Sequence, residues 1–315
     1  MAHPLRGLAV AAVALALAGC AVRPAVPFTH STFEGFEVIS HVPENPRGLV
    51  YLFHGSGGSA AFAERVETVA VLNRLIGQGY GFVSTSSTER TGDRRWDALN
   101  GSAATNPDLT RLSRLQAHLV ATTPVTPQTP LFGIGMSNGA RFVTLWGQRV
   151  TEAGNPVGAI WASMGRTAPA VAAPGGLTVP VVFSTAINDF TSPPGPIFAS
   201  YATARDAGTP TELYVSSERR LGTLPYLRIP GIDGREAEGI VDALKATGVW
   251  DADGERVVDD IQQAVARASG AQFPTSVAPQ RQEIENETAV QLAVHQFTAE
   301  YGANVSAFFQ RHAGR

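Results

Sequence analysis

The chain has 315 residues, of which 44% are hydrophobic and 16% are charged, and its formal net charge at pH 7 is −3. This length is enough for one large domain with an insertion, and the composition is ordinary for a globular protein. The charge is close to neutral and the sequence has no basic run with interleaved aromatic residues, which excludes the usual nucleic-acid-binding patterns.

The N-terminus has the pattern of an export signal. Arg6 gives a positive start, and residues 7–17 form an uncharged apolar run that is too short to span a bilayer. The next residues, Leu17-Ala18-Gly19-Cys20, resemble a bacterial lipobox, which implies that Cys20 is acylated and becomes the first residue of the mature protein. The alternative is an ordinary secretory signal that is cleaved near the same place.

Cys20 is the only cysteine of the chain, so disulfides are not expected and a lipid anchor explains its position. We therefore expect residues 1–19 to be a lipoprotein signal peptide and residues 20–32 to be the lipidated cysteine and its tether. Ala21, and not Asp, follows the cysteine, so the expected location is the outer membrane or the outer face of the cell membrane.

The first predicted elements are a strand at 33–40 and a second strand at 48–53, which is apolar throughout, as in a parallel sheet that is covered on both faces. The second strand ends in His54-Gly55-Ser56-Gly57-Gly58. Such an H-G-x-G-G loop is the usual source of an oxyanion-hole donor, here the backbone N–H groups of Ser56 and Gly57. A glycine-rich turn or a phosphate cradle is the alternative, but neither a Walker lysine nor a G-x-G-x-x-G pattern is present.

A helix at 60–76 and a strand at 80–85 come next. Residues 88–97 contain arginines and Trp96, and two interpretations stay open for them. They either contact a substrate or form a solvated loop with a partly packed tryptophan, and the second is favoured. Asn106-Pro107 then opens a helix, with asparagine as its cap and proline in its first turn.

The next apolar run, at 130–134, leads into Gly135-Met136-Ser137-Asn138-Gly139. A G-x-S-x-G between a strand and a helix predicts a nucleophile elbow, in which Ser137 lies on a tight turn and the glycines let the backbones approach. The backbone N–H of Asn138 lies at the start of the following helix, where it is free to hold negative charge.

With the H-G-x-G-G loop followed by the G-x-S-x-G elbow, the chain resembles the α/β-hydrolase superfamily. Within it the chain resembles bacterial esterases of the poly(3-hydroxyalkanoate) depolymerase and feruloyl-esterase type, over residues 48–312 apart from an insertion. The resemblance implies a mostly parallel sheet with helices on both faces and a serine nucleophile. Both motifs are specific for the superfamily but not for a substrate.

The resemblance also implies that an acid and then a histidine follow the serine along the chain. Asp189 matches the acid, because it follows a predicted strand at 179–185. His295 matches the base, because it lies just ahead of the C-terminal helix. The other histidine after Asp189, His312, is expected to be a solvated cation at the end of that helix.

The predicted strand at 211–215 is the one after which the histidine of this fold is expected, yet His295 follows eighty residues later (295 − 215 = 80). We therefore expect a core at 33–215, a helical cap insertion at 216–286 and a C-terminal part of the core at 287–315. A cap in this place is expected to lie over the mouth of the site and shape its pocket.

The sequence as a whole predicts an exported, lipid-anchored serine esterase that uses Ser137, Asp189 and His295 on a small or polymeric ester. This chemistry requires no metal and no organic cofactor. A serine peptidase or amidase of the same fold and a non-catalytic surface-binding lipoprotein are the alternatives. No pattern in the sequence indicates the acyl group, the alcohol or the oligomeric state.

Overall fold

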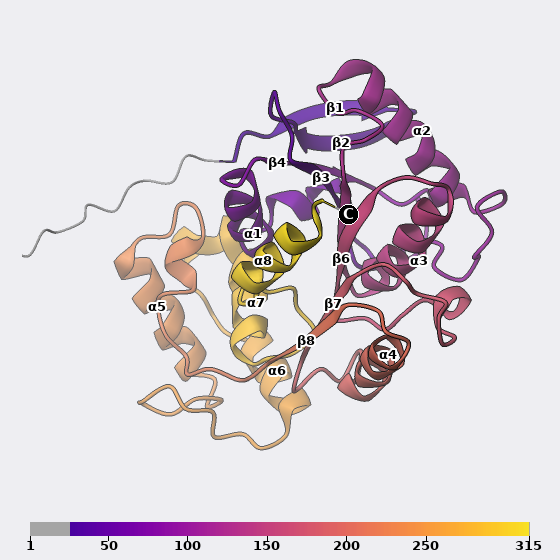
Figure 1. Cartoon of the computed structure of the whole chain (residues 1–315). Helices are drawn as coiled ribbons and strands as arrows, with labels where there is room; N and C mark the ends of the chain where they lie inside the picture. The colour runs from indigo at the N-terminus through magenta and orange to yellow at the C-terminus, as the bar shows by residue number, and fades with distance from the viewer. Residues whose placement is uncertain (1–25, 315) are drawn as a thin grey trace, which may run out of the picture.

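The computed structural model describes residues 26–314. Its centre is one eight-stranded sheet in the order β1-β2-β4-β3-β5-β6-β7-β8 (Figure 1). The strands are β1 Thr29–Phe33, β2 Phe36–His41, β3 Gly48–Phe53, β4 Tyr80–Thr85, β5 Leu131–Met136, β6 Val157–Ser163, β7 Val181–Ala186 and β8 Thr211–Ser216. Strands β4 to β8 and β3 run parallel, whereas β1 and β2 are antiparallel to their neighbours.

The first predicted strand, at 33–40, corresponds to β2 from Phe36 on, but its predicted start is wrong because the chain turns back there. Glu34 and Gly35 have φ angles of 50° and 77°, and this turn joins β1 to β2 as a hairpin. Glycine adopts such angles at little cost, which is why the turn falls here. Since β1 begins at Thr29, the last part of the expected tether at 20–32 belongs to the sheet.

Helices cover both faces of the sheet, which confirms the predicted α/β-hydrolase fold. The helices α1 Val66–Ile76 and α8 Gly302–His312 pack on one face with one hydrophobic cluster. The helices α2 Pro107–Thr122, α3 Asn138–Glu152 and α4 Pro194–Asp206 pack on the other face with a second cluster. Strand β3 is buried along its whole length, as its continuous apolar sequence predicted, and so are β4 and β7, which also contain serine and threonine.

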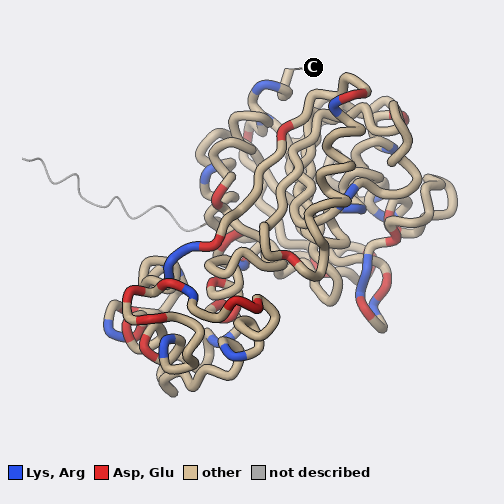
Figure 2. The backbone as a smooth tube through the Cα atoms, turned by 90° about the horizontal axis from the view of Figure 1, so that it is seen from below, with Lys and Arg blue, Asp and Glu red and all other residues tan. Residues whose placement is uncertain are grey.

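Between β8 and His295 the chain forms three α-helices, α5 Gly234–Lys245, α6 Ile261–Ser269 and α7 Arg281–Gln291. They share a hydrophobic cluster of their own, and Figure 2 shows them as a lobe beside the sheet that is rich in charged residues. The predicted end of the insertion, at 286, is wrong because it falls inside α7. A helix cannot be divided there without breaking its hydrogen bonds, so the cap insertion runs on to the end of α7.

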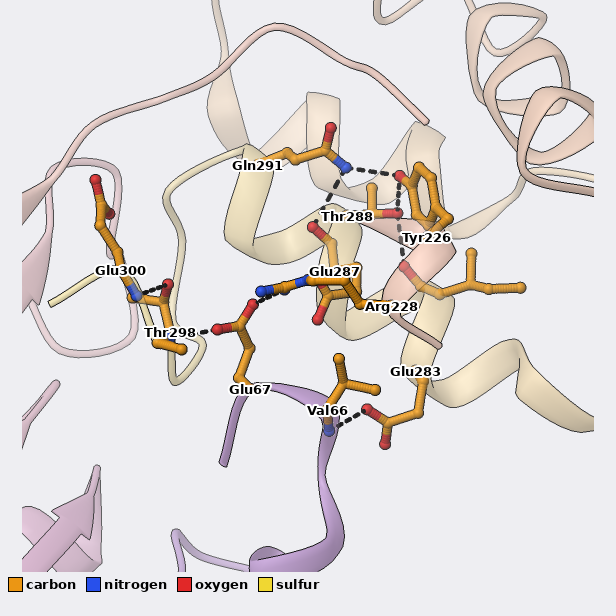
Figure 3. A network of polar contacts seen from close by, with 12 residues as sticks. Val66, Glu67, Tyr226, Arg228, Glu283, Glu287, Thr288, Gln291, Thr298 and Glu300 are labelled. Carbon is orange, nitrogen blue, oxygen red and sulfur yellow. Dashed lines mark hydrogen bonds and ion pairs between the residues drawn. The ribbon is translucent and has the colours of Figure 1, made fainter. Parts of the chain in front are cut away.

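A cluster of charged side chains joins this lobe to the core (Figure 3). The Arg228 guanidinium binds the carboxylate of Glu67 on α1 and, at 2.6 Å, that of Glu287 on α7. The other oxygen of Glu67 accepts the backbone N–H of Ala299, four residues after His295. The charged cluster Glu67–Arg228–Glu287 therefore holds the cap, α1 and the chain after His295 together.

No helix within residues 26–314 is both long and apolar enough to cross a membrane.

Candidate active site

Ser137 lies on the turn between β5 and the first residue of α3, with φ 58° and ψ −115°. A positive φ is uncommon for a residue other than glycine, and here it raises the hydroxyl out of the sheet. A Cβ atom on Gly135 would lie 2.1 Å from the carbonyl oxygen of Gly139, and one on Gly139 would lie 2.2 Å from that of Phe53. Both glycines are therefore required by backbone contact, as the elbow pattern predicted.

The structure brings together the three side chains that the sequence singled out. The Nε2 atom of His295 lies 2.8 Å from the Ser137 hydroxyl, and its Nδ1 atom lies 2.7 Å from a carboxylate oxygen of Asp189. A carboxylate only accepts hydrogen bonds, so the proton of the neutral ring is on Nδ1 and Nε2 is free to accept from Ser137. This is the geometry that general-base activation of a serine requires.

Asp189 is held on its loop after β7 by its own carboxylate. Its side chain is fully buried, and the oxygen that does not face His295 accepts the backbone N–H groups of Thr191 and Ser192 at 2.9 and 2.7 Å. These bonds leave the other oxygen for the imidazole and fix its direction.

The loop of Asp189 is also tied to the loop of His295, through a residue that sequence reasoning missed. The Asn188 backbone N–H donates to the Ala293 carbonyl at 3.0 Å, and its side-chain amide donates to the Leu292 carbonyl at 2.9 Å. The hydrogen-bond partners of Asn188 lie about one hundred residues away along the chain (293 − 188 = 105). The only sequence signal for Asn188 was therefore its position next to Asp189.

Of the three expected oxyanion donors, two are free to act. The Gly57 N–H donates to the Asp93 carbonyl at 2.6 Å, so the prediction for Gly57 is wrong, because this single hydrogen is already used. Ser56 and Asn138 line the same hollow as Ser137. The Asn138 N–H opens α3 and has no carbonyl partner within the helix, as is general for a first helical residue.

The side chain of His54 contacts the loop that carries Ser56. It is buried, its Nδ1 atom lies 2.7 Å from the Gly55 carbonyl, and its Nε2 atom accepts the Ser87 backbone N–H at 3.1 Å. Burial is the main cause that lowers the pKa of His54 to about 4, so the ring is neutral at pH 7. A neutral ring can accept at Nε2, which a charged ring cannot do.

Trp96 is only 1% exposed, which excludes the interpretation that it stacks on a substrate. Its indole N–H donates to the His54 carbonyl at 3.1 Å. The side-chain amide of Asn138 accepts the Trp96 backbone N–H at 2.7 Å and donates to the Trp96 carbonyl at 3.1 Å. The loop at 88–97 is thus fastened to the elbow and to the oxyanion loop, a role for Trp96 and the Asn138 side chain that no sequence pattern indicated.

A hollow of about 380 Å³ opens over the Ser137 hydroxyl. It is lined by core loops and helices: Ser56, Arg95, Ser137, Asn138, Arg141, Gly165, Arg166, Thr191, Ser192, Pro193, Pro196 and Ile197. None of these residues comes from the cap, so the expectation that the cap shapes this pocket is not met. A larger hollow of about 730 Å³ between α2 and α3 contains no residue of the Ser137–Asp189–His295 group and is not the site of this chemistry.

Two further expectations concern residues outside the hollow. His312 is 5% exposed and packs against the Phe308 ring at 4.6 Å, so the prediction of a solvated cation is wrong. The helix α8 lies against the sheet to its last turn, which covers that side chain. The signal peptide at 1–19 and Cys20 lie outside the described residues.

No cluster of three or more histidine, cysteine, aspartate or glutamate side chains that could hold a metal ion occurs within residues 26–314.

Among known proteins, the chain is similar only to solved structures. Neither a protein-family model nor a curated protein sequence matches the chain. Among solved structures, the chain is similar to a thermostable esterase, with a TM-score of 0.47 and 14% identity over 61% of this chain and 55% of that one.

Two others are a ferulic acid esterase, with a TM-score of 0.46 and 15% identity over 61% of this chain and 90% of that one, and a phospholipase/carboxylesterase from Dyadobacter fermentans. The second has a TM-score of 0.42 and 20% identity over 69% of this chain and 97% of that one. The assignment of the fold rests on the sheet and its helices, and not on these values.

Proposed function

We propose that the protein is a serine hydrolase that cleaves carboxylic esters. The observation that carries this proposal is the continuous chain of hydrogen bonds from Ser137 through His295 to Asp189, at the mouth of a hollow and on a strained elbow. Such an arrangement places a nucleophile, its base and the group that orients the base in the order that acyl transfer needs.

The reaction begins when the Ser137 oxygen attacks the ester carbonyl carbon while Nε2 of His295 takes the hydroxyl proton. The negative oxygen of the tetrahedral intermediate is held by the backbone N–H groups of Ser56 and Asn138, and one such donor typically lowers the barrier by about 3 kcal/mol. The C–O bond to the alcohol then breaks, and His295 returns its proton to the leaving alcohol. Asp189 stabilises the imidazolium during both steps.

Water completes the cycle on the acyl-enzyme. It enters where the alcohol left, His295 takes one of its protons, and the hydroxide attacks the same carbonyl carbon. The second tetrahedral intermediate breaks its bond to the Ser137 oxygen, which recovers its proton from His295. The free acid leaves and the neutral imidazole is restored.

The cap contributes to this site by position. The helix α7 leads directly to His295, and the charged cluster Glu67–Arg228–Glu287 holds both ends of that segment against α1. In this proposal the cap sets the place of the base, while the core forms the wall of the hollow. This division fits the lining of the hollow, to which the cap contributes no residue.

The test is hydrolysis of 4-nitrophenyl esters from acetate to decanoate by the full chain, purified in a mild detergent. We expect turnover of the esters that the hollow admits and covalent labelling by a fluorophosphonate probe, since both need an activated serine. Labelling without turnover of any ester would contradict ester cleavage and direct attention to amides. If the protein neither hydrolyses an ester nor reacts with the probe, the result would favour a non-catalytic binding protein.

We also propose that the protein is exported and anchored by lipid on Cys20. The support is the sequence Leu17-Ala18-Gly19-Cys20 after a short apolar run, together with the absence of any other cysteine from the chain. An alkyne fatty acid fed to bacteria that express the gene is expected to label the protein and to leave a Cys20→Ser variant unlabelled. Equal labelling of the two proteins would rule out this anchor.

A further inference from the structure

The hollow over Ser137 is strongly cationic. Arg141 reaches it from the first turn of α3, Arg166 from the loop after β6, and Arg95 from the loop at 88–97. Its lining contains these three arginines and no aspartate or glutamate. The N-terminus of α3 points into the same space and adds positive potential of its own.

Arg141 and Arg166 have no partner for their charge within residues 26–314: neither guanidinium makes a hydrogen bond or an ion pair there. Arg141 is partly buried and Arg166 is exposed. Two other partly buried arginines, Arg149 and Arg256, each bind a glutamate, which Arg141 does not. Burial, and secondly the charge of Arg166, lower the pKa of Arg141. Two like charges at one hollow repel each other, so an anion bound between them would offset that repulsion.

The third arginine is already neutralised. Arg95 binds the Asp93 carboxylate at 2.8 Å, and its side chain is 56% exposed. Arg141 also borders a neighbouring hollow that is lined by Glu89, Asp97 and Asp108, but none of these carboxylates forms an ion pair with it. Asp108 accepts the backbone N–H groups of Thr88 and Asp97. Glu89 likewise accepts the backbone N–H of Arg95 at 2.8 Å. The uncompensated charge therefore belongs to Arg141 and Arg166.

We propose that the substrate is an ester that carries a carboxylate, and that Arg141 and Arg166 bind this carboxylate beside Ser137. The inference rests on the proposed ester hydrolysis and names its substrate class. A guanidinium fork matches the two oxygens of a carboxylate and binds them by charge-assisted hydrogen bonds. A hollow of about 380 Å³ has room for a small ester with such a group.

The carboxylate belongs either to the acyl part or to the alcohol part of the ester, and two pairs of substrates distinguish these sources. The first pair is 4-nitrophenyl hydrogen adipate and 4-nitrophenyl methyl adipate, which place the charge or its neutral methyl ester on the acyl chain. The second pair is 4-acetoxybenzoate and its methyl ester, which place it on the leaving alcohol. We expect kcat/KM of the anionic member to exceed that of its neutral partner in one of these pairs.

The variant R141Q/R166Q is expected to reduce that preference by about 10- to 100-fold, the range of charge-assisted hydrogen bonds. Sodium chloride is expected to weaken the preference of the unmodified enzyme, because salt screens partly exposed charges. The matched control is R205Q, since Arg205 is exposed, binds Asp206 and does not line the hollow. It is expected to keep the preference intact.

Equal kcat/KM values within both pairs would overturn the inference while leaving the proposed hydrolysis in place, and so would a double variant that keeps the full preference. Binding of adipate monomethyl ester, measured by calorimetry, separates the two proposals further. If no ester is hydrolysed but this anion binds the unmodified chain and not R141Q/R166Q, the result supports the anion site and contradicts ester hydrolysis. If the anion does not bind and no ester is hydrolysed, both the anion site and ester hydrolysis are contradicted.

Discussion

Replacing Ser137 by alanine is expected to lower kcat for ester hydrolysis by about 10⁴- to 10⁶-fold, the loss seen when a triad nucleophile is removed. In the proposed reaction the hydroxyl oxygen forms the bond to the acyl carbon, and no other described side chain lies within hydrogen-bond distance of Nε2 of His295. His295→Ala should cost about as much, and Asp189→Asn about 10⁴-fold, because an amide would favour the wrong tautomer. Initial rates against 4-nitrophenyl esters measure all three.

These three side chains act as one unit, so their losses should not add. We expect the double variant Ser137→Ala/His295→Ala to be about as slow as either single variant. Ser113→Ala is the matched control, since Ser113 is exposed on α2 and distant from the Ser137 hollow. A Ser137→Ala variant with more than about a hundredth of the normal rate would contradict the assignment of the nucleophile.

Replacing Arg228 by methionine is expected to lower the free energy of unfolding by about 2–4 kcal/mol, somewhat less than for a fully buried pair because Arg228 is 42% exposed. At pH 8 the loss arises because the carboxylates of Glu67 and Glu287, whose side chains are 6% and 1% exposed, lose their counterion. Urea denaturation followed by tryptophan fluorescence measures the loss, with Trp250 in the cap and Trp96, Trp146 and Trp161 in the core contributing to the signal.

A second substitution shows whether uncompensated charge is the cause. Glu287→Gln in the Arg228→Met background removes one buried charge and should restore much of the lost stability. Arg205→Met, which breaks an exposed pair with Asp206, should change the unfolding free energy by less than about 0.5 kcal/mol. If Arg228→Met were no more harmful than Arg205→Met, the charged cluster would not be what holds the cap.

The same cluster gives the stability a dependence on pH. Burial and, secondly, the charge of Glu67 raise the pKa of Glu287 above its ordinary value. The folded protein therefore binds a proton that the unfolded chain releases, and this contribution is complete at low pH and is lost as the pH rises through the raised pKa. Arg228→Met should accordingly recover part of its loss between pH 8 and pH 5, whereas the double variant with Glu287→Gln should not.

The parts of the site that lie close together in the sequence were predictable. The elbow around Ser137 and the loop after His54 depend on glycines at fixed spacings, because backbones pass too closely there for a Cβ atom. Asp189 and His295 followed from the order that the resemblance implied. The structure places His295 within hydrogen-bond distance of both Ser137 and Asp189.

What escaped prediction depends on partners that are distant along the chain. Gly57 looked like an oxyanion donor, but its N–H is used by Asp93, on a loop whose course the sequence does not indicate. Trp96 looked partly packed, yet it is enclosed between His54 and Asn138. Arg141 and Arg166 line the same hollow because α3 and the loop after β6 both border it. No spacing of residues within either segment predicts this arrangement.

The contact of Gly139 with the end of β3 has a wider consequence. A Cβ atom there would lie 2.2 Å from the Phe53 carbonyl oxygen and 2.5 Å from that of His54, so the nucleophile's turn rests directly on the main chain that leads to Ser56. The spacing between the Ser137 oxygen and the backbone of Ser56 is thus set by main-chain contact and not by Arg141 or Arg166. Mutations can therefore exchange these two arginines and retune substrate choice during evolution without rebuilding the elbow.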